Sequence, residues 1–209
     1  MAGRRQLTIA GACALATPMM LGAAELLRRP IETTAAFHWF DGQRPDARAY
    51  FSDLELQAHD GRSVRFFSDL LENRTVLINV VATQCRGICK TTTHRLAVAR
   101  DALGDRFGKD IFFVSVTSDP ARDTTDVLRQ FTLEQGVAGP GWTFVTGPRA
   151  NLEFILKQLG QQMMAEHAQF GQFTLGHVPS SRWQRLKADV APRTVAERLR
   201  DLADSRRSA

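Results

Sequence analysis

Apolar residues along the chain follow two spacings, a two-residue period typical of strands and a wider spacing typical of helices. Residues 54–57 and 64–66 alternate polar and apolar side chains on either side of a turn sequence at 59–62, which predicts a β-hairpin. Mainly apolar, β-branched runs at 77–81 and 111–116 predict two strands that are covered on both faces.

Helical spacing recurs between and after these strands. Pro120 suits the first turn of a helix, so we expect one helix to begin at Asp119-Pro120. Strands and helices that alternate in this way predict the α/β class, with a mixed sheet, an N-terminal β-hairpin and flanking helices on both faces. The further elements expected are helices at 68–71, 91–103, 119–135, 151–159 and 195–202, a strand at 142–145 and an edge strand at 183–186.

The N-terminus has the pattern of an export signal. Basic residues Arg4 and Arg5 precede a mainly apolar stretch at 7–27, and Arg4-Arg5-Gln6-Leu7 resembles a twin-arginine signal. The same stretch is about long enough to span a bilayer uncleaved, and a cytosolic helix is the other alternative. We therefore expect a periplasmic protein, exported or anchored in the inner membrane. Its expected parts are a signal peptide or membrane anchor at 1–29, a linker at 30–48 and a folded domain at 49–209.

Composition and charge exclude several function classes. The formal net charge is +5, but arginine is spread along the chain without interleaved aromatic residues, so we expect no nucleic-acid partner. The charge is typical of a solvated face, or of one that favours an anionic membrane or partner. No GxGxxG, Walker, HExxH or GxSxG pattern is present.

Two cysteines, Cys85 and Cys89, carry the candidate chemistry. They lie one helical turn apart, between the strand at 77–81 and the helix behind it. Unpaired amides at a helix start, together with Arg86 and Lys90, favour the thiolate form, which is both a nucleophile and a soft-metal ligand. The pair can close to a disulfide or hold a metal. The alternative is two buried structural cysteines.

Four stretches together resemble the SCO/SenC family of thioredoxin-like copper proteins, from about residue 50 to the C-terminus. The specific combination is the CxxxC segment after a strand with the later segment at 119–124. The resemblance implies a thioredoxin-like fold and an exported or membrane-tethered protein. It also implies copper binding by two cysteines and a distant histidine, in assembly of the copper A centre of cytochrome c oxidase. The four stretches are 59–71, 77–89, 114–124 and 141–147.

The resemblance implies that the metal ligands are Cys85, Cys89 and His177. Copper(I) is a soft ion that prefers thiolates and accepts imidazole as a third ligand. His177 matches the place of the family's histidine, but about one strand of the family pattern is absent after it. Either 172–175 substitutes for that strand or the sheet is one strand short, and a solvated loop histidine is the alternative for His177. The other histidines are His38, His59, His94 and His167.

Two further positions bear on the site. Lys90 stands where family members often have proline, which costs rigidity but adds charge beside a thiolate. Asp119 and Asp123 match the family's acidic segment, and we expect Asp119 to act mainly as a helix N-cap.

These observations lead to one hypothesis and two alternatives. The hypothesis is a copper metallochaperone whose partner is the copper-site subunit of cytochrome c oxidase or another periplasmic thiol or copper protein. One alternative is a thiol–disulfide oxidoreductase, although such proteins usually carry CxxC. The other is a degenerate thioredoxin-like protein that binds no metal. Whether the chain is an enzyme is left open by the sequence.

Overall fold

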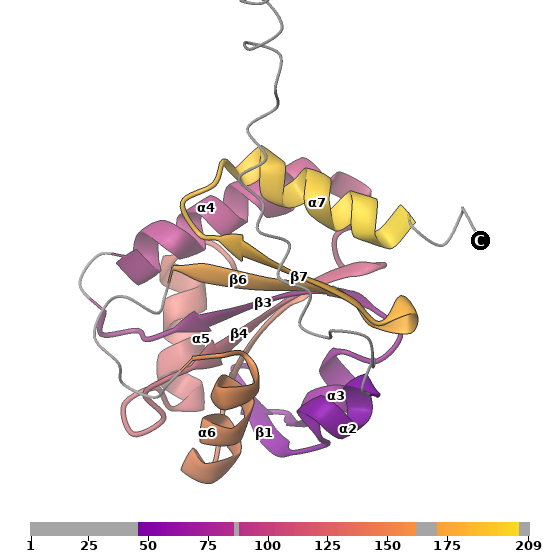
Figure 1. Cartoon of the computed structure of the whole chain (residues 1–209). Helices are drawn as coiled ribbons and strands as arrows, with labels where there is room; N and C mark the ends of the chain where they lie inside the picture. Colours follow the sequence, from indigo (N-terminus) through magenta and orange to yellow (C-terminus); the bar gives the residue numbers. More distant parts are fainter. Residues whose placement is uncertain (1–45, 86–87, 162–170, 205–209) are drawn as a thin grey trace, which may run out of the picture. The chain divides into compact units, whose positions relative to one another are not determined.

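Two parallel strands, β3 (Thr75–Val81) and β4 (Ile111–Thr117), lie at the centre of one mixed sheet (Figure 1). All seven residues of β3 are buried, so both faces of the sheet are covered there, as its apolar sequence predicts. The strand order is β2-β1-β5-β4-β3-β6-β7. The computed structural model describes residues 46–85, 88–161 and 171–204.

Helices flank this sheet. Helix α4 packs along α7, which also contacts β3 and β6, whereas α6 contacts β4. The predicted α/β class is confirmed. The elements after the hairpin are α4 (Ile88–Leu103), η1 (Gly104–Arg106), α5 (Thr125–Glu134), β5 (Trp142–Thr146), α6 (Arg149–Gln158), β6 (Gln172–His177), η2 (Val178–Ser180), β7 (Arg182–Lys187) and α7 (Pro192–Asp204).

The predicted hairpin forms from β1 (Glu55–Ala58) and β2 (Ser63–Arg65), which pair antiparallel. Gly61 in the turn has a φ of 88°, a conformation that glycine adopts without steric cost. Strand β1 also pairs with β5, so the hairpin extends the main sheet. A short helix on each side of the hairpin, α2 (Ala47–Phe51) and α3 (Phe66–Leu70), completes this region. Helix α2 begins inside the segment expected to be a linker.

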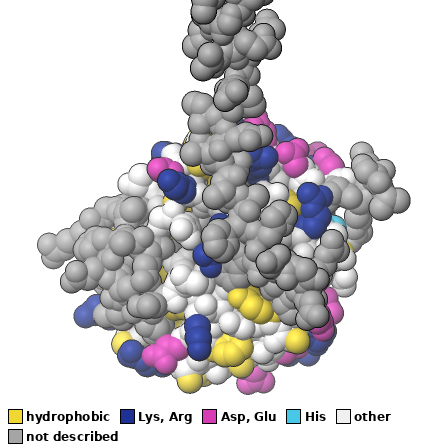
Figure 2. Space-filling model, in the orientation of Figure 1, with side chains coloured by type: hydrophobic (Ala, Val, Ile, Leu, Met, Phe, Trp, Pro, Cys, Tyr) yellow, Lys and Arg dark blue, Asp and Glu magenta, His cyan; other side chains and the backbone are white. Residues whose placement is uncertain are grey.

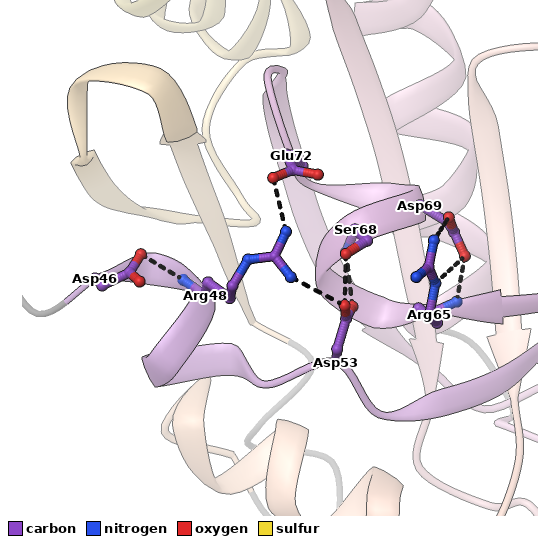
Figure 3. Close-up of polar contacts among 7 residues, drawn as sticks. All are labelled: Asp46, Arg48, Asp53, Arg65, Ser68, Asp69 and Glu72. Carbon is purple, nitrogen blue, oxygen red and sulfur yellow. Dashed lines mark hydrogen bonds and ion pairs between the residues drawn. The ribbon is translucent and has the colours of Figure 1, made fainter.

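A polar network joins α2 to α3 at the surface (Figure 3). The Arg48 guanidinium donates to Asp53 at 3.3 Å and to Glu72 at 2.8 Å. Asp53 in turn accepts from the backbone N–H of Ser68 at 2.8 Å and from its hydroxyl at 2.5 Å. Asp46 caps α2 by accepting from the Arg48 N–H. Since these carboxylates are already paired within the network, we assign it a structural role.

Charged side chains of both signs are interspersed on the described surface shown in Figure 2. Many arginines lie within 3.3 Å of a carboxylate, as in the i,i+4 pairs Arg106–Asp110 and Arg149–Glu153. Such exposed pairs contribute little to stability individually. The carboxylates neutralise much of the arginine charge locally. This agrees with the interpretation of the net positive charge as that of a solvated surface.

The helix expected to begin at Asp119-Pro120 begins six residues later, at Thr125. Thr124 is its N-cap and accepts from the Val127 N–H at 3.4 Å. The prediction that Asp119 caps the helix is therefore wrong. A separate turn competes at this point, because the Asp119 carbonyl accepts from the N–H groups of Arg122 and Asp123, at 3.0 and 2.8 Å.

The sheet contains the strand that seemed absent from the sequence. Strand β6 pairs antiparallel with β3 on one side and with β7 on the other. Residues 172–175 are therefore the strand, and His177 is its last residue, followed by η2. The predicted edge strand is confirmed, because β7 ends the strand order.

No helix among the described residues is long and apolar enough to cross a membrane. The expected signal peptide or anchor at 1–29 lies outside the described residues, and so does most of the expected linker.

Buried side-chain hydrogen bonds connect the three central strands β3, β4 and β5. The Ser115 hydroxyl donates to Asn79 Oδ1 at 2.7 Å and accepts from Trp142 Nε1 at 2.9 Å. These three side chains come from β4, β3 and β5 respectively, and Trp142 packs edge to face against Phe113. The chain of bonds satisfies polar groups that would otherwise be costly to bury.

Candidate metal centre

The two cysteines lie where β3 leads into α4. The chain leaves β3 at Val81, turns through a bend in which the Cys85 N–H donates to the Ala82 carbonyl at 3.1 Å, and enters α4 at Ile88. Cys89 is in the first turn of that helix and is 2% exposed, whereas Cys85 is half-buried. Both are free thiols, and they lie close enough for Cys85 to raise the pKa of Cys89. The structure therefore brings the two sulfurs together, one on a bend and one on a helix.

Burial, rather than the helix dipole, dominates the state of the Cys89 thiol. The pKa of Cys89 is raised to about 12: burial raises it most, a hydrogen bond with the Ala82 backbone lowers it, and Cys85 and Asp123 add smaller upward shifts. The prediction that the helix start favours the thiolate form is therefore wrong for Cys89 in the metal-free protein. A soft cation that binds there has to displace the proton.

A buried carboxylate holds the bend that carries Cys85. Asp123 is 0% exposed, and its oxygens accept from the Thr83 hydroxyl at 2.5 Å and from the Thr83 N–H at 3.3 Å. Asp123 also accepts from the Thr117 hydroxyl, at the end of β4, at 2.5 Å. Burial raises the pKa of Asp123, while the hydrogen bonds from Thr117 and Thr83 lower it. The 119–124 segment thus acts on the dithiol through Asp123, a role that the sequence analysis did not foresee.

The neighbouring Asp119 is buried in the same turn. Its carboxylate pairs with the Arg122 guanidinium at 2.9 Å, and its N–H donates to the Thr117 hydroxyl at 2.9 Å. The ends of β3 and β4 are joined directly as well, since the Ser118 N–H donates to the Val81 carbonyl at 2.9 Å. Several hydrogen bonds therefore hold the ends of β3 and β4 together next to the cysteines.

The structure does not bring His177 to the cysteines. His177 pairs with Thr75, the first residue of β3, whereas Cys85 follows the last. Six residues of strand at about 3.3 Å each separate these ends by about 20 Å. His177 is also 3% exposed, with Nδ1 lying 2.6 Å from the Ser180 hydroxyl, so it is not a solvated loop histidine either. Within the described ranges, no three His, Cys, Asp or Glu residues are grouped so that they could hold a metal.

The other histidines divide into two groups. His59 belongs to the hairpin turn, where its Nδ1 accepts from the Phe144 N–H at 3.3 Å, and His94 is exposed on α4. His38 and His167 lie outside the described residues. The described chain resumes at Gly171, and β6 then runs antiparallel to β3. Gly171 therefore lies at the dithiol end of the sheet, whereas His177 ends β6 at the opposite end.

A cleft opens beside the dithiol. Its volume is about 450 Å³, and it is lined on one side by Thr83, Gln84 and Lys90 and on the other by residues of α5, including Val127 and Phe131. Gln84 and Lys90 directly flank the CxxxC segment. Its lining combines apolar side chains with polar and charged ones, as the linings of ligand-binding clefts commonly do.

Solved structures similar to this fold include several Sco proteins. Bradyrhizobium japonicum ScoI, solved with copper bound, is 16% identical with a TM-score of 0.59, over 72% of this chain and 98% of that one. Yeast Sco1 is 18% identical with a TM-score of 0.61, over 74% and 94%. BsSco, described as a member of the Sco family of cytochrome c oxidase assembly proteins with a disulfide switch, is 20% identical with a TM-score of 0.58, over 73% and 92%. At these identities the similarity shows the shared thioredoxin-like fold.

Sequence comparison extends this result from fold to family. No curated protein matches the chain. The family model for SCO1/SenC, in contrast, matches residues 42–180, which include β1 to β6, the CxxxC segment and the acidic turn. Because that match covers well over half of the sequence, the chain belongs to the SCO1/SenC family.

Proposed function

We propose that this protein carries copper(I) on Cys85 and Cys89 and delivers it to the copper A centre of cytochrome c oxidase. The observation that carries the proposal is the pair of free thiols at the junction of β3 and α4, close enough for one to shift the pKa of the other. Two thiolates are a donor set that selects copper(I) over harder ions. Family membership supports it, as does the copper bound in the B. japonicum relative.

The geometry of the pair suits transfer of a metal. Cys89 is fixed in a helix and buried, while Cys85 lies on a half-buried bend next to the cleft. An incoming thiolate of a partner can reach copper from the Cys85 side. The partner we propose is the copper-site subunit of the oxidase, or another periplasmic thiol or copper protein. Delivery there requires export or anchoring through residues 1–29, ahead of a linker at 30–48 and the domain at 49–209.

Copper(I) titration of the reduced full-length chain, in competition with a chromophoric chelator, tests the proposal. We expect one equivalent of tightly bound copper(I). Cys85→Ser and Cys89→Ser should each abolish tight binding, because one thiolate cannot hold the ion against the chelator. Cys13→Ser is the matched control and should bind as the wild type does. A single-cysteine variant with wild-type affinity would sink the proposal.

A second candidate function is reduction of partner disulfides by the same dithiol. The two neighbouring free thiols support it, and the relative BsSco is described as having a disulfide switch. In this reaction the two thiols give two electrons and two protons to a partner disulfide, and a Cys85–Cys89 disulfide forms. A reductant would bind copper weakly and reduce the oxidase subunit stoichiometrically. A protein with neither activity would be the degenerate alternative.

A further inference from the structure

Asp123 is the most completely buried carboxylate among the described residues, and its position is unusual. It lies in the turn between β4 and α5, yet its side chain reaches back to Thr83, forty positions earlier in the sequence. Its other hydrogen-bond partner in the described chain is the Thr117 hydroxyl. Both of these partners are threonines, so hydroxyl and amide groups satisfy the carboxylate instead of a cation. Hydrogen bonds to a carboxylate are among the stronger ones in proteins.

The Asp123 side chain connects the central sheet to the bend that carries Cys85. Thr117 ends β4, a strand paired along its full length with β3. Thr83 is in the bend between β3 and α4, two residues before Cys85. Asp123 therefore fastens the bend to the sheet, while Cys89 is held separately by α4. The position of one sulfur relative to the other depends on that fastening.

We propose that Asp123 is the positioning residue of the dithiol, and that through Thr83 it holds Cys85 at the separation from Cys89 that copper(I) requires. Among the described residues, no hydrogen bond joins Asp123 to either sulfur. Its effect is instead to restrict the bend. The copper part of this inference rests on the proposed function, whereas the effect on the thiols does not.

The fastening opposes disulfide closure as well as supporting metal binding. A disulfide allows only a narrow range of Cα and Cβ separations, and because α4 fixes Cys89, any adjustment that closure needs falls on the backbone at Cys85. A bend held by Asp123 resists that movement. Loss of the contact between Asp123 and Thr83 should therefore weaken copper(I) binding and, at the same time, favour formation of the disulfide.

Thr83→Val tests the inference, because it removes one hydroxyl, keeps the side-chain shape and leaves Asp123 in place. Ser115→Ala is the control: it also removes a buried hydroxyl that bridges β3 and β4, but away from the bend. Asp123→Ala is the stronger variant, and Thr83→Val decides the matter if Asp123→Ala fails to fold. Thermal unfolding of each variant measures the general loss of stability.

Two readouts are made on the full-length chain. The first is copper(I) affinity by chelator competition, where Thr83→Val should lose about tenfold or more, as is typical when a residue that orients a metal ligand is changed. The second uses no copper: the dithiol is equilibrated with glutathione disulfide, which is reduced to two glutathione thiols as the Cys85–Cys89 bond forms. There Thr83→Val should shift the equilibrium severalfold toward the protein disulfide.

The outcomes separate the two proposals. Shifts in Thr83→Val with none in Ser115→Ala, at a similar loss of thermal stability, support positioning by Asp123. Unchanged readouts in Thr83→Val, or equal shifts in both variants, overturn it. If the wild type binds no copper(I), the proposed function fails, and the glutathione equilibrium alone decides the role of Asp123.

Discussion

His177 pairs with Thr75, the first residue of β3, whereas the dithiol follows the last residue of that strand. The antiparallel register of β6 makes this unavoidable: each residue later in β6 lies further from Cys85. A histidine that serves the dithiol has to precede β6 in sequence. His167 is four residues before Gly171, a length of chain that spans at most about 14 Å.

The first prediction compares the two histidines directly. His167→Ala should weaken copper(I) binding by roughly tenfold or more, because imidazole completes a coordination shell that the sulfurs begin. His177→Ala should leave the affinity unchanged and lower thermal stability instead, since the ring is buried beside Ser180. Chelator competition and thermal unfolding on both variants measure this. Loss of affinity in His177→Ala alone would contradict the register argument.

The second prediction concerns unequal reactivity of the thiols. With a pKa of about 12, Cys89 carries only about one thiolate in ten thousand at pH 8, and it is also buried. Iodoacetamide should therefore modify Cys85 much faster than Cys89 in the reduced, metal-free protein. Peptide mapping by mass spectrometry follows each site and separates both from Cys13. Equal rates for the two would show that burial does not control them.

A third prediction follows from His59. Burial lowers its pKa below 6.5, with the charge of Asp60 acting in the opposite direction. Since the folded state favours neutral imidazole, this contribution to stability is complete above pH 6.5 and is lost as the pH falls through the lowered pKa. The free energy of unfolding should decline over that window in the wild type more than in His59→Gln. Denaturant titrations at pH 5 and pH 8 measure the difference. Parallel pH profiles for the two proteins would refute it.

A fourth prediction tests the packing of the last two strands. Gly176 lies opposite Trp183, and a Cβ at Gly176 would overlap the indole ring. Gly176→Ala should therefore cost about 1–3 kcal/mol of stability by overpacking. In a Trp183→Leu background the ring is absent, so the same substitution should cost much less. Denaturant unfolding of the four proteins of this cycle gives the coupling, and additive costs would exclude a direct clash.

Local patterns predicted most of the fold, and tertiary contacts decided the rest. The hairpin and β3 were predictable because alternation and unbroken apolar runs are visible in a few residues. The start of α5 was not, because Asp119-Pro120 has the composition of a helix start while Asp123, held by Thr83, stabilises a competing turn. A bond between residues forty positions apart leaves no local trace.

The site divides in the same way. The closeness of Cys85 and Cys89 follows from their spacing, but the protonation of Cys89 depends on burial by distant segments. The assignment of His177 failed because matching a short sequence neighbourhood does not say at which end of a strand a residue lies. Strand register is a long-range property, and it alone separates His177 from the dithiol.

The unequal attachment of the two sulfurs gives any handover a fixed order. A metal shared by a half-buried sulfur on the bend and a buried sulfur in the first turn of a helix would be open to a partner at the first sulfur only, and would lose that contact first. An acceptor would therefore replace Cys85 first, and Cys89 would be the last protein atom to release the ion. A protein that carries copper(I) as proposed would thus retain the ion until the recipient has bound it, and free copper need not appear in solution at any step.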